Sequence, residues 1–280
     1  LGGVCLNWGC IPTKALLKSA QVFDYLKHSK DYGINIKQYD KDFNAVVNRS
    51  RNIANDMSKG VNFLMKKNKI DVIEGFGKIM PNKIVKVTNG KKTQELEGKN
   101  IIIATGARSR DITSIPKDGS KIFGYREAMT LKKQPKSIII VGSGAIGVEF
   151  AYFYNSMGSK VTLIEYLDRV IPVEDDDISK QLQKSFEKNG IDVMTNSEVT
   201  SVEKKSTGVN VRVMNKKKEQ KISADVLLSA VGVKSNIEGI GLEEVGIAVD
   251  KDKIIVNDFY QTNIPGYYAI GDITKGQALA

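Results

Sequence analysis

The residues with the clearest chemical potential are the chain's only two cysteines, Cys5 and Cys10, which stand five positions apart near its first residue. On a regular α-helix this spacing gives about 7.5 Å of rise and about 140° of rotation. A disulfide tolerates Cα atoms only up to about 7 Å apart. A bond between the two thiols therefore needs a distorted turn, which Asn7 and Gly9 can supply. In a cytosolic protein such a pair is more often catalytic or metal-binding than structural.

Other interpretations of the cysteine pair are open at this point. Zinc is disfavoured, because two thiolates and the single histidine, His28, cannot complete a four-ligand site. Two buried thiols without chemistry are the remaining alternative. The helix predicted from Pro12 onward would bring its positive end close to Cys10 and favour a thiolate there. His28 itself is expected to be a solvent-facing helical residue.

A second pattern, Gly142-Ser143-Gly144-Ala145-Ile146-Gly147, fits G-x-G-x-x-G. It follows the apolar run 137–141 and opens an apolar helix, and the next strand ends at Glu165, 18 residues after the last glycine. In this fingerprint the glycines permit a tight turn, a close approach of the backbone to a pyrophosphate, and close helix–strand packing. The helix N-terminus attracts the phosphates. Glu165 would accept hydrogen bonds from the adenosine ribose and repel a 2′-phosphate, which favours NAD over NADP. A glycine-rich turn in another α/β protein is the alternative.

The elements that must position these residues follow from hydrophobic periodicity. Strands alternate with helices after residue 137, which indicates crossover connections and a parallel sheet, hence an α/β fold with Rossmann-like domains. Residues 108–135 are expected to form a loop, and Lys216–Lys218 a hairpin tip. Helices are predicted over 12–29, 42–67, 146–157 and 176–188. Strands are predicted over 70–74, 84–88, 101–104, 138–141, 160–164, 191–194, 199–203, 209–214, 226–231, 253–256 and 267–270.

Composition and charge exclude several classes of protein. Hydrophobic residues make up 41% and charged residues 26%, as in a globular chain. The net charge of +10 comes from 42 basic residues, of which 35 are lysines spread along the sequence, so a solvated surface is favoured over nucleic-acid binding. The apolar run 137–154 contains Glu149, which disfavours a membrane span. The acidic run 174–177 is interpreted as the N-terminus of a helix, and no metal site is expected. Because the chain opens without methionine, we expect a piece of a longer protein.

The segment Gly2–Lys14 resembles the redox-active disulfide region of the FAD-dependent pyridine nucleotide–disulfide oxidoreductases. Leu6 and Ile11 are most similar to the branch of that family that oxidises dihydrolipoamide, while mercuric and glutathione-type reductases are the nearest alternatives. Further family motifs occur in the expected order. They are Ala104-Thr105-Gly106, the glycine motif described above, Val231-Gly232 and Ala269-Ile270-Gly271-Asp272.

The resemblance implies a role for each matching residue. Cys5 would exchange with the dithiol substrate, Cys10 would form a thiolate against the flavin, and Lys14 would lie near the flavin, paired with Glu149. Electrons would pass from the dithiol through the disulfide and FAD to NAD⁺. The implied FAD contacts are Lys14, Gly77, Thr105, Gly106, Asp272, Gln277, Ala278, Leu279 and Ala280. The implied NAD contacts are Gly142, Gly144, Ala145, Ile146, Gly147, Glu165, Val199, Ala230 and Gly232.

The family also implies a domain arrangement and partners. An FAD domain over 1–112 and 251–280 would enclose an NAD domain over 113–250. The expected partners are a lipoyl domain of a 2-oxoacid dehydrogenase complex and a second copy of the chain, in the cytoplasm. The family's first glycine motif does not precede Leu1, and the family's histidine base, which comes from a dimerisation domain of the partner subunit, has no counterpart here. Trp8 replaces a commoner valine and would shape access to Cys5, and Val233-Lys234-Ser235-Asn236 lacks the arginine that usually follows the glycine. A non-catalytic NAD-binding fragment is therefore the alternative of another class.

Overall fold

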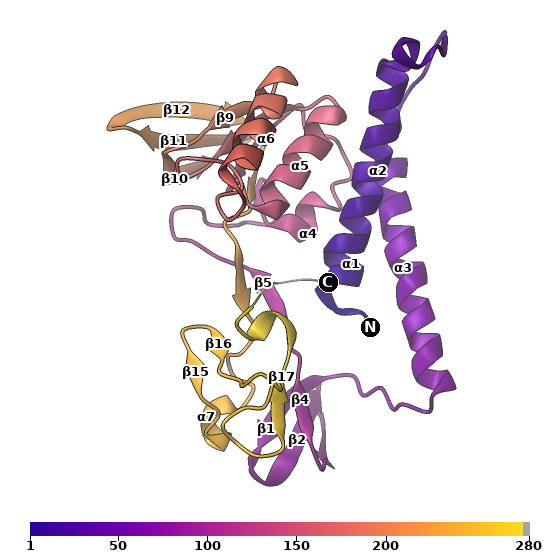
Figure 1. The fold of residues 1–280 in the computed structure, drawn as a ribbon, viewed down its shortest axis with the longest axis vertical. Helices are drawn as coiled ribbons and strands as arrows, with labels where there is room; N and C mark the ends of the chain where they lie inside the picture. Colours follow the sequence, from indigo (N-terminus) through magenta and orange to yellow (C-terminus); the bar gives the residue numbers. More distant parts are fainter. Residues whose placement is uncertain (277–280) are drawn as a thin grey trace. The chain divides into compact units, whose positions relative to one another are not determined.

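The computed structural model describes residues 1–276 and divides into two compact units, both drawn in Figure 1. The first unit contains residues 1–4, 58–108 and the chain from residue 233 onward, and the second contains residues 5–57 and 109–232. The predicted α/β class is confirmed. The boundaries of these units fall at other residues than the predicted boundaries of the FAD and NAD domains. The limits of those domains therefore stay a prediction.

A five-stranded, entirely parallel sheet forms the centre of the second unit, with strand order β6-β13-β7-β8-β9. Helix α5 connects β7 to β8, and helix α6 connects β8 to β9, as the alternating pattern predicts. The central strands are buried along nearly their whole length, as parallel strands covered on both faces should be. The bounds are β6 (Ile122–Phe123), β7 (Ser137–Val141), α5 (Ala145–Ser156), β8 (Lys160–Ile164), α6 (Asp176–Lys188), β9 (Asp192–Met194) and β13 (Val226–Ser229).

An antiparallel sheet follows β9 in the chain, with order β10-β11-β12. Its inward-facing valines on β11 pack in one buried cluster with residues of β7 and β8. Lys216 and Lys217 have φ values of 44° and 68° and join β11 to β12, so the predicted hairpin tip is confirmed. The bounds are β10 (Ser197–Lys204), β11 (Val209–Asn215) and β12 (Lys218–Ala224).

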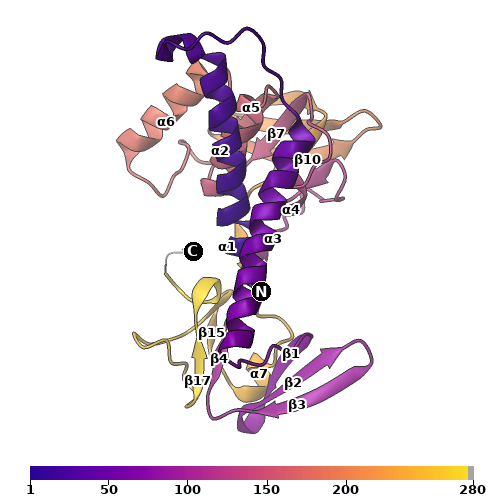
Figure 2. The same ribbon diagram turned by 90° about the vertical axis from the view of Figure 1, so that its right-hand side faces the viewer.

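The helices that precede the parallel sheet in sequence carry the cysteines. Helix α2 and the first half of α3 lie side by side (Figures 1 and 2), and the Ser50 hydroxyl donates to the Pro12 carbonyl oxygen at 3.0 Å. On its other side α2 packs against α5. The bounds are α1 (Gly3–Trp8), α2 (Cys10–Lys27), η1 (Ser29–Tyr32), α3 (Phe43–Lys67) and α4 (Tyr125–Ala128).

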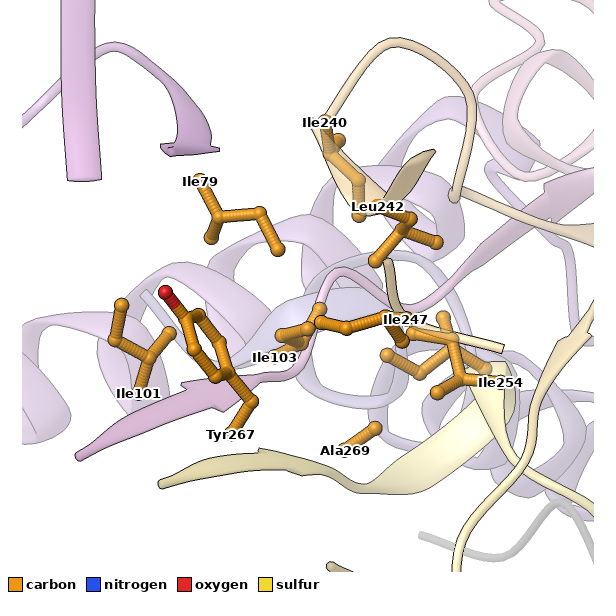
Figure 3. Packing of buried hydrophobic residues seen from close by; sticks show 10 residues of the cluster. Ile79, Ile101, Ile103, Ile240, Leu242, Ile247, Ile254, Tyr267 and Ala269 are labelled. Atoms are coloured by element: carbon orange, nitrogen blue, oxygen red, sulfur yellow. The ribbon is translucent and has the colours of Figure 1, made fainter. Parts of the chain in front are cut away.

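The first unit contains an antiparallel meander, β1-β2-β3, and a parallel pair formed by β4 and β17. Its buried core is drawn in Figure 3, where side chains from β1, β4, β16 and β17 converge with those around α7. The bounds are β1 (Phe76–Met80), η2 (Pro81–Lys83), β2 (Ile84–Asn89), β3 (Lys92–Glu97), β4 (Ile101–Ile103), β5 (Ala107–Ser109), β14 (Val233–Ser235), α7 (Leu242–Val245), β15 (Val249–Asp250), β16 (Lys253–Ile254), β17 (Tyr267–Ala269) and η3 (Gly271–Ile273).

The structure differs from the sequence-based expectations in several places. Residues 70–74 do not form a strand, because no neighbouring strand pairs with them among the described residues. Strands β1, β3 and β12 were not predicted, since β3 and β12 are mostly exposed and lack an apolar alternation. The predicted loop 108–135 contains β5, β6 and α4.

The minor motifs have structural roles. Asp175 caps the N-terminus of α6 by accepting a hydrogen bond from the Asp177 backbone N–H at 2.8 Å, which confirms the helix-start interpretation of the acidic run. His28 is the C-cap of α2 and is exposed.

Within the described residues no group of histidine, cysteine and acidic side chains could hold a metal ion. None of the helices in that part of the chain is long and apolar enough to cross a membrane.

The turn before β6 depends on one carboxylate. Asp118 accepts hydrogen bonds from the backbone N–H groups of Ser120, Lys121 and Ile122 and pairs with Lys204 at 2.6 Å. Burial alone would raise the pKa of Asp118, but the Lys204 hydrogen bond and the backbone N–H groups hold this pKa well below its usual range.

We therefore expect Asp118→Ala to lower the Tm by a few degrees at pH 7. The pKa of Asp118 is lower in the folded chain than in the unfolded chain, where it is near 3.8. The ionised carboxylate therefore stabilises the fold above about pH 4, and this stabilisation is lost as the pH falls towards the folded-state pKa. The Tm difference between wild type and variant should thus shrink below about pH 4. A difference that stays constant from pH 7 to pH 3 in thermal melts would contradict this assignment.

Candidate active site

The two cysteines lie on either side of a break between helices. Cys5 is in α1, Cys10 is the first residue of α2, and Gly9 between them has φ −134° and ψ −115°, which is not helical. The predicted distorted turn is therefore confirmed at Gly9. Both cysteines are half-buried free thiols, and they lie close enough together for Cys5 to raise the pKa of the Cys10 thiol. The pair is positioned for dithiol chemistry, while the disulfide itself stays a prediction.

The surroundings of Cys10 shift the pKa of its thiol in both directions. Burial raises the pKa of the Cys10 thiol, and the hydrogen bond and charge of Cys5 raise it further. A hydrogen bond of the Cys10 backbone and the positive charge of Lys14 lower the pKa by less. Desolvation and Cys5 thus oppose the charges that favour a thiolate at Cys10, and the thiolate itself stays a prediction.

Lys14 and Glu149 form the ion pair that the sequence resemblance implied. The Lys14 ammonium donates to Glu149 Oε1, which joins α2 to α5 across 135 positions of sequence. The Glu149 side chain is 28% exposed on an otherwise apolar helix, so its charge is compensated where an unpaired carboxylate would be costly. The contact is observed, and its part in a reaction stays a prediction.

Trp8, which stands between the cysteines in sequence, is held by two arginines. The guanidinium carbon of Arg51 lies 4.2 Å from the Trp8 ring centroid, and that of Arg126 lies 5.6 Å from it. Arg51 also donates to the Asn7 carbonyl oxygen at 2.6 Å, and burial lowers the pKa of this arginine. Sequence reasoning missed both arginines, because they come from α3 and α4 and no local pattern connects them to Trp8.

The glycine loop has the geometry that the dinucleotide fingerprint requires. Gly142 has φ +97°, and a Cβ there would lie 2.4 Å from the Ala230 carbonyl oxygen. A Cβ at Gly147 would lie 1.9 Å from the Gly142 carbonyl oxygen, whereas a Cβ at Gly144 would meet open space. Gly144 is the N-cap of α5, whose first turn, including Ala145 and Ile146, presents backbone N–H groups without partners within the helix. The loop therefore fits a dinucleotide pyrophosphate.

Four residues outside this loop were also predicted to contact NAD, and the structure gives each of them a different environment. Glu165 directly follows β8, is buried, and accepts hydrogen bonds from Ser143. Ala230 packs against Gly142 and Gly147. Val199 is buried in the core cluster of the sheet, which gives it a packing role. Gly232 has φ +100° and open space beside it. Their contacts with a nucleotide stay predictions.

The predicted FAD contacts that the structure describes lie in the first unit, apart from Lys14. The Thr105 hydroxyl donates to the Asn236 carbonyl oxygen at 2.6 Å, and the Asn236 backbone N–H donates to the Gly106 carbonyl oxygen at 2.8 Å. The Ser235 hydroxyl donates to the Asp272 carbonyl oxygen at 2.9 Å. Ser235 and Asn236 thus join two predicted FAD turns, a role that no sequence signal indicated.

Two further predictions concern the FAD site. Gly77 lies in β1 opposite Val87, and its contact with FAD stays a prediction. Gln277, Ala278, Leu279 and Ala280 lie outside the described residues.

The geometry agrees with what comparison with known proteins shows. A family model described as pyridine nucleotide-disulphide oxidoreductase matches residues 1–280. The chain belongs to this family. Dihydrolipoyl dehydrogenases from Rhizobium etli and Chlorobaculum parvum are each 44% identical to the whole chain, which covers 62% and 60% of their lengths. The crystal structure of LpdA from Mycobacterium tuberculosis superposes with a TM-score of 0.92 at 28% identity, over all of this chain and 61% of LpdA.

As a member of the pyridine nucleotide-disulphide oxidoreductases, the chain is related to FAD-dependent proteins. It spans about three fifths of the length of the curated relatives it matches. A flavoprotein disulfide reductase, RclA from Escherichia coli, has the same fold with a TM-score of 0.84 at 28% identity, so the fold is shared by several members of the family.

The electrostatic link between Lys14 and Cys10 can be tested in a single-thiol background. In Cys5→Ala only Cys10 titrates, and adding Lys14→Met should raise its pKa, because the ammonium lowers it in the wild type. The measurement is the pH midpoint of thiolate ultraviolet absorbance.

Lys18→Met in the same background is the matched control. It removes a lysine one turn further along α2, whose ammonium contacts Gln21. This control should leave the midpoint in place. Equal midpoints in all three proteins would show that Lys14 does not act on Cys10.

The glycine loop offers a pair of substitutions with opposite expectations. Gly147→Ala must displace the Gly142 carbonyl, so it should lower the Tm by several degrees. The methyl group that Gly144→Ala adds would lie in open space at the N-cap of α5, so the Tm should stay within about a degree of the wild-type value. The new methyl group would occupy the approach of a pyrophosphate, so NADH affinity should fall at least tenfold. Thermal melts and NADH fluorescence titrations check both, and unchanged NADH binding in Gly144→Ala would contradict this use of the loop.

Proposed function

We propose that the protein is a dihydrolipoyl dehydrogenase, which oxidises dihydrolipoamide to lipoamide and reduces NAD⁺ by way of the Cys5–Cys10 pair and FAD. The observation that carries this proposal is the pair of half-buried free thiols on either side of the break before α2, in the same unit as a dinucleotide-binding loop. The sequence similarity to dihydrolipoyl dehydrogenases over the whole chain supports it.

The cysteines would act by thiol–disulfide exchange. A substrate thiolate attacks the Cys5 sulfur of the oxidised pair, and Cys10 leaves as a thiolate. The second substrate thiol then attacks the mixed disulfide, which releases lipoamide and leaves the pair reduced. Two protons leave the substrate, and its two electrons now reside on the cysteines. Lys14 lowers the pKa of Cys10 and so favours its thiolate as the leaving group.

A base must accept the substrate protons, and His28 is unsuited to this. It caps the far end of α2, which has 18 residues, so about 27 Å of helix separates it from Cys10. We propose instead that the base is a histidine of a partner subunit, as the family resemblance implies. A homodimer is therefore part of the proposal.

The residues around the two proposed cofactor sites have complementary tasks. Bound FAD would supply the hydride chemistry between the dithiol and NAD⁺. Thr105, Gly106 and Asp272 would hold FAD, and Gly144, Ala145 and Glu165 would hold NAD. The open space at Gly144 and the positive φ of Gly106 fit a close approach by phosphates or a flavin to the backbone. We further propose a lipoyl domain of a 2-oxoacid dehydrogenase complex as the carrier of the substrate, and the cytoplasm as the location.

In the full-length protein, Cys10→Ser should abolish dihydrolipoamide–NAD⁺ turnover, because the substrate electrons could no longer be stored on a pair of sulfurs. Turnover is followed as NADH absorbance, and the visible flavin spectrum reports whether FAD is bound. His28→Ala is the control and should keep wild-type turnover. Full activity of Cys10→Ser would contradict the proposal, and a colourless wild-type protein would favour a non-catalytic NAD-binding fragment. Faster turnover with glutathione than with lipoamide would favour a glutathione-type reductase.

A further inference from the structure

Ser143, the second residue of the glycine loop, contacts one carboxylate oxygen with two donors. Its backbone N–H and its hydroxyl each donate to Glu165 Oε2 at 2.7 Å. The residue is completely buried. Its carbonyl oxygen accepts a hydrogen bond from the Ile171 backbone N–H at 3.0 Å, so Ser143 also ties the segment after β8 to the loop. The G-x-G-x-x-G pattern leaves this position open to any residue, so the serine is a feature of this chain rather than of the pattern.

Glu165 is buried, with 7% of its surface exposed, and its second oxygen is also bound. Oε1 accepts a hydrogen bond from the Leu167 backbone N–H at 2.9 Å. The backbone of Glu165 is fixed as well, since its N–H donates to the Met194 carbonyl oxygen and its carbonyl oxygen accepts from the Ser197 N–H. A buried carboxylate requires such donors, and here they leave the side chain one orientation.

The acceptor capacity that remains on Glu165 is small and directed. A carboxylate offers about four lone-pair positions, of which Ser143 and Leu167 occupy three. The remaining position is on Oε1. A ribose hydroxyl can donate a hydrogen bond there, whereas a 2′-phosphate has negative charge and would be repelled.

The nearest basic side chain after β8 is already engaged. The Arg169 guanidinium pairs with Asp176 at 2.7 Å and donates to the Pro172 carbonyl oxygen at 3.1 Å. An arginine near the end of this strand can accommodate a 2′-phosphate in NADP-dependent proteins. Because Arg169 is held by Asp176, this compensation for the Glu165 charge would require breaking an ion pair.

We propose that Ser143 is a specificity-determining positioning residue, whose hydroxyl fixes the Glu165 carboxylate so that it selects NAD over NADP. This inference rests on the proposed use of the loop for NAD. Without the hydroxyl, Oε2 retains only the backbone N–H as a donor from residue 143, and the carboxylate gains freedom to turn away from the ribose. The effect of Ser143 is therefore exerted through Glu165 and not by contact with the nucleotide.

The test is the ratio of the NADPH and NADH dissociation constants, measured by fluorescence titration of the full-length protein. Wild type should bind NADH more tightly. Ser143→Ala should weaken NADH binding by about five- to tenfold, within the range typical of the loss of one hydrogen bond, with a much smaller change for NADPH. The ratio should fall accordingly, and a merely structural role for Ser143 would weaken both cofactors alike.

Ser159→Ala is the matched control. Ser159 is also a buried serine, its hydroxyl donates to the Pro135 carbonyl oxygen at 2.7 Å, and it precedes β8, whereas Glu165 follows that strand. This variant should keep the wild-type ratio. Ser143→Gly removes the same hydroxyl with minimal steric demand and replaces Ser143→Ala if the latter does not fold.

A double-mutant cycle identifies the route of the effect. In a Glu165→Ala background, Ser143→Ala should change NADH affinity by less than twofold, because its partner is absent. Equal cofactor ratios in wild type and Ser143→Ala, or full additivity with Glu165→Ala, would overturn this inference. A wild-type protein that binds neither NADH nor NADPH would instead overturn the proposed function.

Discussion

The contact between α2 and α5 is the interaction on which the second unit's chemistry depends. Helix α5 starts at the glycine loop, and its Glu149 meets Lys14, one turn beyond Cys10 on α2. The other end of α5 is bound as well, since Lys27 and Lys41 donate to the carbonyl oxygens of Ser156 and Met157. Cations at the end of a helix offset its negative partial charge. One helix thus connects the thiol pair, the nucleotide loop and the sheet.

Burial shifts the pKa values of titratable groups near the two ends of this helix contact. The same desolvation that raises the pKa of Cys10 also lowers that of Lys41, which lies beside Lys27. In each case desolvation, which the fold creates, is the largest cause of the shift. A positive charge near Cys10 acts in the opposite direction, since Lys14 lowers the pKa of that thiol.

The sequence was sufficient for elements whose apolar pattern is local. Strand β8 and helix α6 have the predicted bounds, and α3 differs by one residue, because each buries a regular apolar face. Strand β3 is mostly exposed and carries no such signal. Residues 70–74 have a β-rich composition, but a strand also needs a partner, and composition alone does not supply one.

The candidate site was less predictable, because its contacts join distant segments. The family resemblance anticipated the Lys14–Glu149 pair, whereas no periodicity or spacing could have done so. The contacts of Ser143 with Glu165, of Asn236 with Thr105 and of Arg51 with Trp8 were not foreseen, since each depends on tertiary packing. The raised pKa of Cys10 was not foreseen for the same reason, because burial is a property of the folded chain.

The contacts of Trp8 with the guanidinium groups of two arginines have an optical consequence. Trp8 is the only tryptophan in the sequence, so all indole emission of the protein originates within three residues of Cys5 and two of Cys10. Its excited state responds to the adjacent guanidinium groups and to any rearrangement of α1. The redox segment thus contains an intrinsic fluorophore, and oxidation and reduction of the cysteine pair can be followed without attaching a dye.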